Sequence, residues 1–203
     1  MKRTYMLAAA LVVMLGTAAA QTFSERGKPL FKDDFSAATL DSHWGGKLGT
    51  WELADGAVKI SERAEDKHAA VRRYPLKYHD AIFEFSFRFE GAKAIHLSIN
   101  NKGGHVCRLV ITPTGMVLQT DKPNATSNIK PARLGALMVP VEAGKWHKVV
   151  LEVRGQRMTA QMDGGKIFSG ENPAVDVDKA DFGFAVSGVS ALLDNVAVYE
   201  VRQ

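Results

Sequence analysis

The most constraining feature of the sequence is a phenylalanine at every second position between residues 81 and 90. Phe83, Phe85, Phe87 and Phe89 alternate there with Glu84, Ser86, Arg88 and Glu90. Successive side chains of a β-strand point to opposite faces, so the aromatic rings share one face and the polar groups the other. The run therefore predicts an antiparallel strand with its phenylalanine face in the core and its polar face in water.

The same alternation recurs along the chain, whereas the 3.6-residue period of a helix is rare. The segments that show it are 95–100 and 146–153, and the further short segments predicted as strands are 30–35, 68–73, 105–112, 116–120, 181–187 and 191–201. Asp55-Gly56 and Asp163-Gly164-Gly165 stand between further short apolar segments, and such sequences are typical of hairpin turns. About a dozen short strands predict an all-β fold, a two-sheet antiparallel jelly-roll sandwich.

The first 20 residues are predicted to be a cleavable secretory signal. Lys2 and Arg3 precede an apolar run over 6–16, and small residues follow up to Ala20, which is the order found in such signals. The apolar run is shorter than the roughly 18 to 20 residues that cross a bilayer. We therefore expect no stable membrane anchor after cleavage, a single domain over 21–203, and a periplasmic or secreted location.

Charge and cysteine content narrow the functional classes. The chain has 26 Lys and Arg against 22 Asp and Glu, and removal of residues 1–20 leaves 24 against 22. Basic residues are scattered among acidic ones, whereas a nucleic-acid-binding protein carries a clustered basic stripe, so no nucleic-acid partner is expected. Cys107 is the single cysteine, which excludes an internal disulfide, and its apolar neighbours predict a small buried side chain.

Both ends of the domain resemble concanavalin-A-like jelly rolls. Segments 31–35, 40–44 and 51–60 look like their opening strands, 193–200 looks like their closing strand, and 92–100, 104–108 and 144–147 resemble the secreted 3-keto-disaccharide hydrolase-like group, which is related to family 16 glycoside hydrolases. The resemblance covers 30–201. It implies a carbohydrate-active hydrolase or lyase whose substrate is a di- or oligosaccharide, 3-keto sugars included.

The resemblance does not extend to the catalytic motif of family 16 glucanases, Glu-x-Asp-x-x-Glu, because strand 105–112 contains no carboxylate. Retaining hydrolysis needs two carboxyl groups roughly 5 to 5.5 Å apart. That mechanism is therefore not expected. A non-catalytic glycan-binding module and a structural envelope protein stay open as alternatives.

The polar faces of strand 81–90 and of the two strands after it supply the candidate catalytic residues. If the sheet carrying 81–90 is the concave one, Glu84, His96 and Arg108 lie side by side. His96 or Glu84 would then transfer a proton, and Arg108 would stabilise a developing oxyanion. Asn100 is predicted to bind saccharide hydroxyls beside them. The alternative is a set of cross-strand pairs on a solvated face.

His105 and Trp146 are predicted to contact the saccharide as well. His105 belongs to the Gly-His-x-Cys-Arg segment that resembles the family, although its parity with Cys107 favours a half-buried imidazole. Trp146 has surface parity, and a flat aromatic ring can stack on the apolar face of a sugar. Trp44 and Trp51 are the other candidate platforms, with core packing as the alternative for Trp51.

Two further features complete the predicted site. The segment 121–144 is rich in proline and glycine, without periodicity, and is predicted to be a loop that crosses the rim of one sheet and closes the site. Asp34 near the first strand and Asp194 near the last resemble the ligands of a structural calcium ion on the convex side of related folds. Calcium takes six to eight oxygen ligands. The alternative is that both are acids of turns or strand edges.

Overall fold

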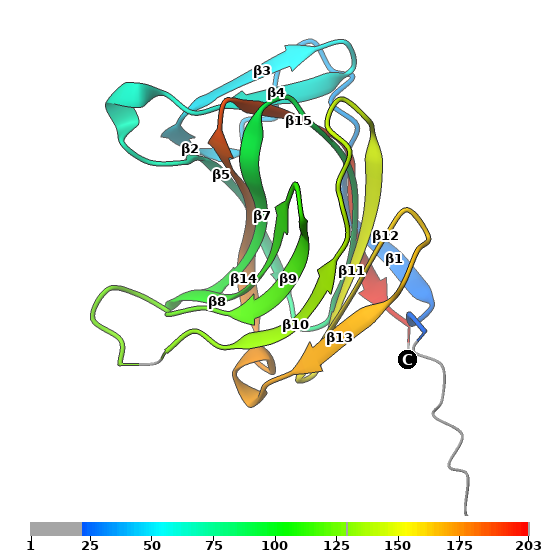
Figure 1. Cartoon of the computed structure of the whole chain (residues 1–203). Helices are drawn as coiled ribbons and strands as arrows, with labels where there is room; N and C mark the ends of the chain where they lie inside the picture. The colour runs from blue at the N-terminus through cyan, green and yellow to red at the C-terminus, as the bar shows by residue number, and fades with distance from the viewer. Residues whose placement is uncertain (1–21, 129, 203) are drawn as a thin grey trace, which may run out of the picture.

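The structure is a computed structural model that describes residues 22–128 and 130–202, which form two antiparallel β-sheets packed face to face (Figure 1). The strands of this range are β1 (Arg26–Asp33), β2 (Gly45–Leu48), β3 (Thr50–Ala54), β4 (Ala57–Ser61), β5 (Ala70–Tyr78), β6 (Ala81–Phe89), β7 (Ala92–Asn101), β8 (Gly104–Thr112), β9 (Gly115–Thr120), β10 (Arg133–Met138), β11 (His147–Arg154), β12 (Arg157–Met162), β13 (Phe168–Glu171), β14 (Lys179–Gly188) and β15 (Ser190–Val201). Short 3-10 helices lie at η1 (Ala64–Asp66) and η2 (Pro173–Val175).

The strand order confirms the predicted all-β, two-sheet jelly-roll sandwich. Sheet A has the order β13-β12-β11-β6-β15-β4-β3, and β1 pairs with β15 at its side. Sheet B has the order β10-β9-β8-β7-β14-β5-β2. Neighbours in each sheet are often far apart in sequence, because the chain passes repeatedly from one sheet to the other.

The phenylalanine face of β6 forms the centre of the core, as its alternation predicts. Phe83 and Phe85 are each 1% exposed. Their rings pack edge-on against Phe182 and Phe184 of β14 in the opposite sheet, with ring centroids 5.6 and 5.1 Å apart. Edge-to-face contacts at this distance stabilise aromatic pairs beyond their buried area. This packing holds the two sheets together.

Both predicted hairpin turns are present. Asp55 and Gly56 have φ angles of 55° and 73°, and Asp163 and Gly164 have 52° and 67°. Two consecutive residues in the left-handed region define the type I′ turn, whose twist matches that of paired strands. The turns join β3 to β4, and β12 to the segment that leads to β13.

The prediction of one irregular loop over 121–144 is wrong in its middle. Strand β10 lies within it and pairs with β9 at the edge of sheet B, Arg133 opposite Gln119. A register shift between Arg133 and Gly135 interrupts the pairing. The strand has only six residues and carries this irregularity, so its period of two is too short to stand out among the prolines around it.

Two strands that follow each other in the chain, β6 and β7, lie in different sheets. Sheet B is curved, and its outer face is concave (Figure 1). Strand β6 lies in sheet A between β11 and β15, while β7, the next strand of the chain, lies in sheet B. The expectation that 81–90 belongs to the concave sheet is therefore wrong.

The N-terminal signal prediction falls on residues outside the described range. Across residues 22–128 and 130–202, no helix has the length and apolar character needed to cross a membrane.

Candidate functional site

A row of outward-facing residues crosses sheet B from edge to edge. Cross-strand pairing joins, in order, Gly45, Arg73, Gly183, Ser98, Arg108, Gln119 and Arg133. Paired residues have their side chains on the same face of a sheet. The residues that alternate with this row, such as Leu97 and Phe182, are 0% exposed in the core. The row therefore lies on the concave face, and we call it the concave row.

A pocket of about 630 Å³ lies over the middle of the concave row. Its lining residues include Gly45, Gly46, His68, Arg73, His96, Ser98, His105, Arg108, Gly183 and Ala185. Glycine, serine and alanine on β7 and β14 leave space, and longer basic side chains stand around them. None of the lining residues is Asp or Glu. In Figure 1, the β4–β5 connection, which contributes His68, extends beside this face.

His96 and Arg108 lie side by side in the pocket, as predicted. The Nη1 of Arg108 is 3.2 Å from the Nδ1 of His96. Burial and the nearby guanidinium of Arg108 lower the pKa of His96 to about 4, so the ring is neutral at pH 7. Arginine can only donate, so Nδ1 is the acceptor and the proton stays on Nε2. His96 therefore offers a ligand a donor and not a base.

A chain of hydrogen bonds orients His105 in the opposite way. Nδ2 of Asn100 donates to Oδ1 of Asp181 at 2.5 Å, which leaves Oδ1 of Asn100 to accept from Nδ1 of His105 at 2.7 Å. Burial, then the charges of Arg73 and Arg108, lower the pKa of His105. At neutral pH its Nε2 is thus an unprotonated acceptor. Asn100 is 0% exposed, so its side chain positions His105 from below.

His105 is half-buried, as predicted, but a local irregularity puts its side chain on the other face of the sheet from the one that its parity predicts. The register shifts between Ile99 and Asn100, so Ile99 is opposite Cys107 while Asn100 is opposite His105. This β-bulge places His105 on the outer face, although it is two residues from the core-facing Cys107. A strict period of two would place the His105 side chain on the core-facing side of sheet B, and that prediction is wrong.

Arg108 is held by a buried carboxylate beneath the pocket. Its Nε is 2.5 Å from Oδ2 of Asp121, which is 5% exposed. Gln119 donates from Nε2 to the other oxygen of the same carboxylate at 3.2 Å. Both contacts fix the guanidinium plane toward the pocket. Asp121 thus supports this site from the 121–144 segment through its contact with Arg108.

Glu84 does not join His96 and Arg108. It lies on β6, on the outer face of sheet A, paired with Val150 on one side and Ala197 on the other. Its carboxylate forms ion pairs with Arg26 and with Lys148, the latter at 3.5 Å. Because β6 and β7 belong to different sheets, the three predicted catalytic residues do not converge.

The three tryptophans that were predicted as candidate sugar platforms do not lie at the concave pocket. Trp146 is exposed, as predicted, but it lies near Arg88, a residue of sheet A, 5.3 Å from ring centroid to Cζ. Trp44 is 1% exposed and donates from Nε1 to Asp33 at 2.8 Å, so the prediction of Trp44 as a sugar platform is wrong. Trp51 is buried as well, in line with its core-packing alternative. None of the three lines the concave pocket.

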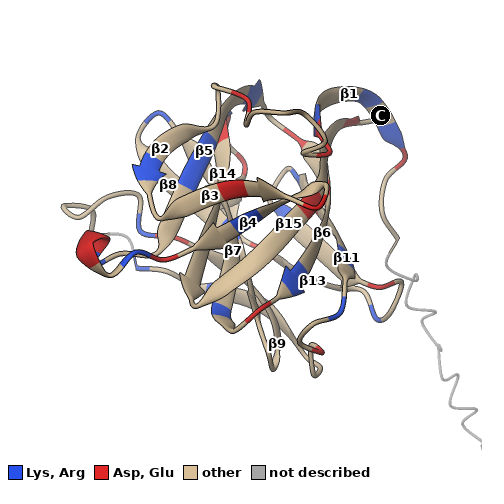
Figure 2. Ribbon diagram, turned by 90° about the horizontal axis from the view of Figure 1, so that it is seen from above, with Lys and Arg blue, Asp and Glu red and all other residues tan. Residues whose placement is uncertain are grey.

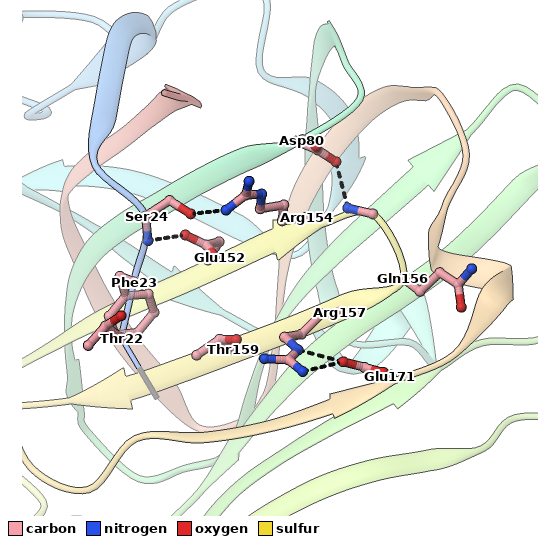
Figure 3. A pocket seen from close by; sticks show the side chains of 11 residues that line it. Thr22, Phe23, Ser24, Asp80, Glu152, Arg154, Gln156, Arg157, Thr159 and Glu171 are labelled. Atoms are coloured by element: carbon pink, nitrogen blue, oxygen red, sulfur yellow. Dashed lines mark hydrogen bonds and ion pairs between the residues drawn. The ribbon is translucent and has the colours of Figure 1, made fainter. Parts of the chain in front are cut away.

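A second pocket, of about 670 Å³, lies where the first described residues cross sheet A (Figure 3). Its polar groups contact one another. The carboxylate of Glu152 accepts from the Ser24 amide at 2.7 Å, and Arg154 donates to the Ser24 hydroxyl at 3.0 Å. Arg157 pairs with Glu171 at 2.5 Å (Figure 3). These contacts attach the start of the domain to the sheet and leave fewer groups for a ligand than the concave pocket does.

Of the two acids of the calcium prediction, Asp34 directly follows β1, and Asp194 lies within β15 beside a register shift between Asp194 and Ala197. Asp34 accepts from the backbone and hydroxyl of Ser36 at 3.1 and 2.6 Å. Burial, together with the charges of Asp34 and Asp33, raises the pKa of Asp194. A cation between these carboxylates would relieve that repulsion, and Asp34 and Asp194 are the residues that would hold it. Across the described residues, however, no group of three or more His, Cys, Asp or Glu has the spacing of a metal site.

The sequence did not predict that Arg73 and Gly183 belong to this site. Arg73 on β5 and Gly183 on β14 lie opposite each other, although 110 positions separate them in the sequence. Arg73 is the last residue of the predicted strand 68–73, so its exposure could have been predicted. The strands that lie beside it in the sheet could not have been predicted, because nothing local in the sequence identifies which strands pair.

No protein-family model and no curated protein matches this chain. Solved structures match at the level of fold. The carbohydrate-binding module CBM66 from Bacillus subtilis is 12% identical with a TM-score of 0.63, over 78% of this chain and 96% of that one. An endo-β-1,4-glucuronan lyase from Trichoderma reesei is 18% identical with a TM-score of 0.58, over 85% and 95%.

A non-specific endo-β-1,3(4)-glucanase from family GH16 is 14% identical with a TM-score of 0.59, over 90% of this chain and 94% of that one. Identities this low show the fold alone. The chain has the two-sheet jelly-roll fold that these structures share.

Proposed function

We propose that this protein binds a saccharide in the concave pocket of sheet B. The observation that carries the proposal is a pocket of about 630 Å³ in which donors and acceptors surround a floor of small residues. Its volume is in the range of small-molecule sites. Sugar hydroxyls both donate and accept, and the pocket provides for both. Arg73, Arg108 and Nε2 of His96 donate, while Nε2 of His105 accepts.

The structural neighbours support a carbohydrate ligand by analogy. Their names describe a carbohydrate-binding module, a glucuronan lyase and a glucanase. A shared fold does not by itself carry a shared function. The proposal therefore depends on the side chains of the pocket.

A screen of neutral and acidic oligosaccharides, followed by titration calorimetry, tests this proposal. The double variant His96→Ala/His105→Ala should weaken binding by about tenfold or more, since two ligand hydrogen bonds are lost. Trp146→Ala, on the other side of the molecule, should leave binding unchanged. If Trp146→Ala abolishes binding and the double variant does not, the site lies outside the concave pocket. A wild type that binds no saccharide would favour a structural envelope role.

A proton-abstracting enzyme is the second candidate, favoured by the unprotonated Nε2 of His105. Such a base can remove a carbon-bound proton beside a carbonyl or carboxyl group. The electron pair left on carbon forms a double bond as the glycosidic C–O bond breaks, and the leaving oxygen takes up a proton. A lyase, including one for 3-keto sugars, fits this chemistry. Two-carboxylate hydrolysis does not, because the lining residues include no Asp or Glu.

Product analysis distinguishes the enzyme from the binding module. Wild type and His105→Gln are incubated with keto-disaccharides and oligosaccharides, and products are separated by chromatography with mass detection. Unsaturated products formed by the wild type alone would support the lyase. Binding without turnover by either protein would support the module.

We propose in addition that the chain is exported and cleaved after Ala20, to a periplasmic or secreted location. The charged, apolar and small residues of the first 20 positions support this. Mass spectrometry of exported material should find Gln21 at the N-terminus. Recovery of chains that keep Met1 would contradict it.

A further inference from the structure

We infer that the saccharide of the concave pocket carries a carboxylate, as uronic acids do, and that Arg73 is the residue that binds it. This inference rests on the saccharide-binding function proposed above and names the class of its ligand.

Arg73 has no hydrogen-bond or ion-pair partner among the residues that the structure describes. Most arginines of the described range pair with a carboxylate, namely Arg26, Arg63, Arg88, Arg108, Arg157 and Arg202. Arg73 and Arg133 form neither an ion pair nor a side-chain hydrogen bond within residues 22–128 and 130–202. Both belong to the concave row. The arginines left free for an external anion thus lie on the face that carries the pocket.

The side chain of Arg73 extends toward the pocket that it lines. A Cβ atom built on Gly183 would lie 2.8 Å from Cγ of Arg73. The stem of Arg73 therefore extends over Gly183, along the concave row and toward the pocket. Any larger residue at position 183 would occupy that path.

The floor of the pocket separates Arg73 from Arg108. Arg73 and Arg108 are separated by Gly183 and Ser98, which places their strands three steps apart. At about 4.8 Å per step, their backbones are roughly 14 Å apart. Arg73 and Arg108 thus line the pocket on either side of small residues. A ligand lying between them can contact both.

The acidic residues near the pocket do not neutralise the positive charge of Arg73 and Arg108 at the pocket surface. Asp121 is 5% exposed and paired with Arg108, and Asp181 accepts a hydrogen bond from Asn100. Neither lines the pocket. Basic residues are visible on β2 and β5 at one end of sheet B (Figure 2). The surface presented to a ligand is therefore cationic.

A carboxylate is the anion that suits this arrangement. The planar guanidinium donates two parallel hydrogen bonds to the two oxygens of a carboxylate. The remaining partners in the pocket are a neutral donor on His96 and a neutral acceptor on His105, which match hydroxyl groups. A sugar ring with one carboxylate and several hydroxyls uses all of these groups.

The test compares two tetrasaccharides with the same β-1,4 backbone, one of glucuronic acid and one of glucose. Titration calorimetry should show that the wild type binds the acidic ligand at least about tenfold more tightly. Arg73→Gln should weaken binding of the acidic ligand by about tenfold and change binding of the neutral ligand by less than about twofold. Arg73→Lys keeps the positive charge but loses the paired N–H donors of the guanidinium, so its affinity for the acidic ligand should lie between those of the wild type and Arg73→Gln.

The matched control is Arg157→Gln, which makes the same charge change at an exposed arginine of sheet A and should leave both affinities unchanged. Melting curves confirm that each variant folds. Equal binding of both tetrasaccharides, unaffected by Arg73→Gln, would overturn the carboxylate inference and leave saccharide binding standing. Binding of neither ligand, in a protein that binds no other saccharide, would remove the proposed function itself. A sulfated tetrasaccharide that binds as tightly as the uronic acid would also overturn the carboxylate assignment.

Discussion

Nδ1 of His105 lies 2.7 Å from Oδ1 of Asn100, and this contact determines which nitrogen of His105 faces the pocket. Asn100 is itself oriented by Asp181, to which its Nδ2 donates at 2.5 Å. Two residues that do not line the pocket thus set the hydrogen-bonding character of a third. The same principle operates at His96, where Arg108 occupies Nδ1 and leaves Nε2 as the donor.

The bridge through Asn100 is expected to contribute to stability. Asn100→Leu leaves Asp181 and His105 without their partner, and unsatisfied polar groups of this kind cost about 1–3 kcal/mol. Urea denaturation should show a loss of that size in the free energy of unfolding. Gln156→Leu, at an exposed position, should change it by less than about 0.5 kcal/mol. Equal effects of the two substitutions would contradict the role of the bridge.

Stability should fall as the pH is lowered through the range set by His96. Its pKa is about 4 in the folded protein against an ordinary value of 6.5. The unfolded chain therefore binds more protons between these values, and stability present above pH 6.5 is lost as the pH falls toward 4. The loss assigned to His96 is at most about 3 kcal/mol.

The pH prediction is measured by comparing denaturation curves of wild type and His96→Gln from pH 7 to pH 4. Both proteins contain the same carboxylates, so the difference between them isolates the imidazole. The variant should show the smaller dependence on pH. Parallel profiles would mean that His96 takes up its proton as easily in the folded state as in the unfolded one.

The inter-sheet aromatic core should be sensitive to truncation. Phe85 is 1% exposed and packs on Phe184, so Phe85→Ala is expected to cost about 3 to 5 kcal/mol in reversible denaturation. Ser86→Ala, on the opposite face of the same strand, should cost about 0.5 kcal/mol or less. A loss below about 1 kcal/mol for Phe85→Ala would be inconsistent with the core position.

Cys107 should be unreactive in the folded protein. Its side chain is fully buried, and burial raises the pKa of the thiol to about 12, so the reactive thiolate is almost absent at neutral pH. A chromogenic disulfide reagent should modify it only after unfolding in guanidinium. Rapid modification of the native protein, at a rate near that of the unfolded chain, would contradict its burial.

The calcium prediction can be tested at Asp194, whose raised pKa means that its negative charge opposes folding at neutral pH. If Asp34 and Asp194 hold calcium, a hundredfold excess over the dissociation constant should raise the melting temperature by roughly 5–10 °C. Asp194→Asn should remove this rise, and Asp178→Asn, an exposed control, should keep it. A wild type without a calcium response, made more stable by Asp194→Asn alone, would exclude the ion.

Several features of the fold could be predicted from the sequence because they depend on residues close together in the chain. The alternation of Phe83 to Phe89 specifies which side of β6 is buried, and Asp55-Gly56 specifies a hairpin turn. Burial of Cys107 and exposure of Trp146 follow from the same parity. Parity fails where a bulge intervenes, as at His105, since one extra residue turns the following side chains to the other face.

The candidate site depended on strand pairing. The sequence by itself determined that the chain forms short strands, which of their faces are apolar, and that it lacks the two-carboxylate motif of family 16 glucanases. Only the tertiary structure decided that β6 and β7 lie in different sheets, which separates Glu84 from His96, and that β5 and β14 bring Arg73 beside Gly183. The direction of a side chain is a local property of an extended backbone, whereas the choice of a strand's neighbour is made by packing between segments that are distant in the chain.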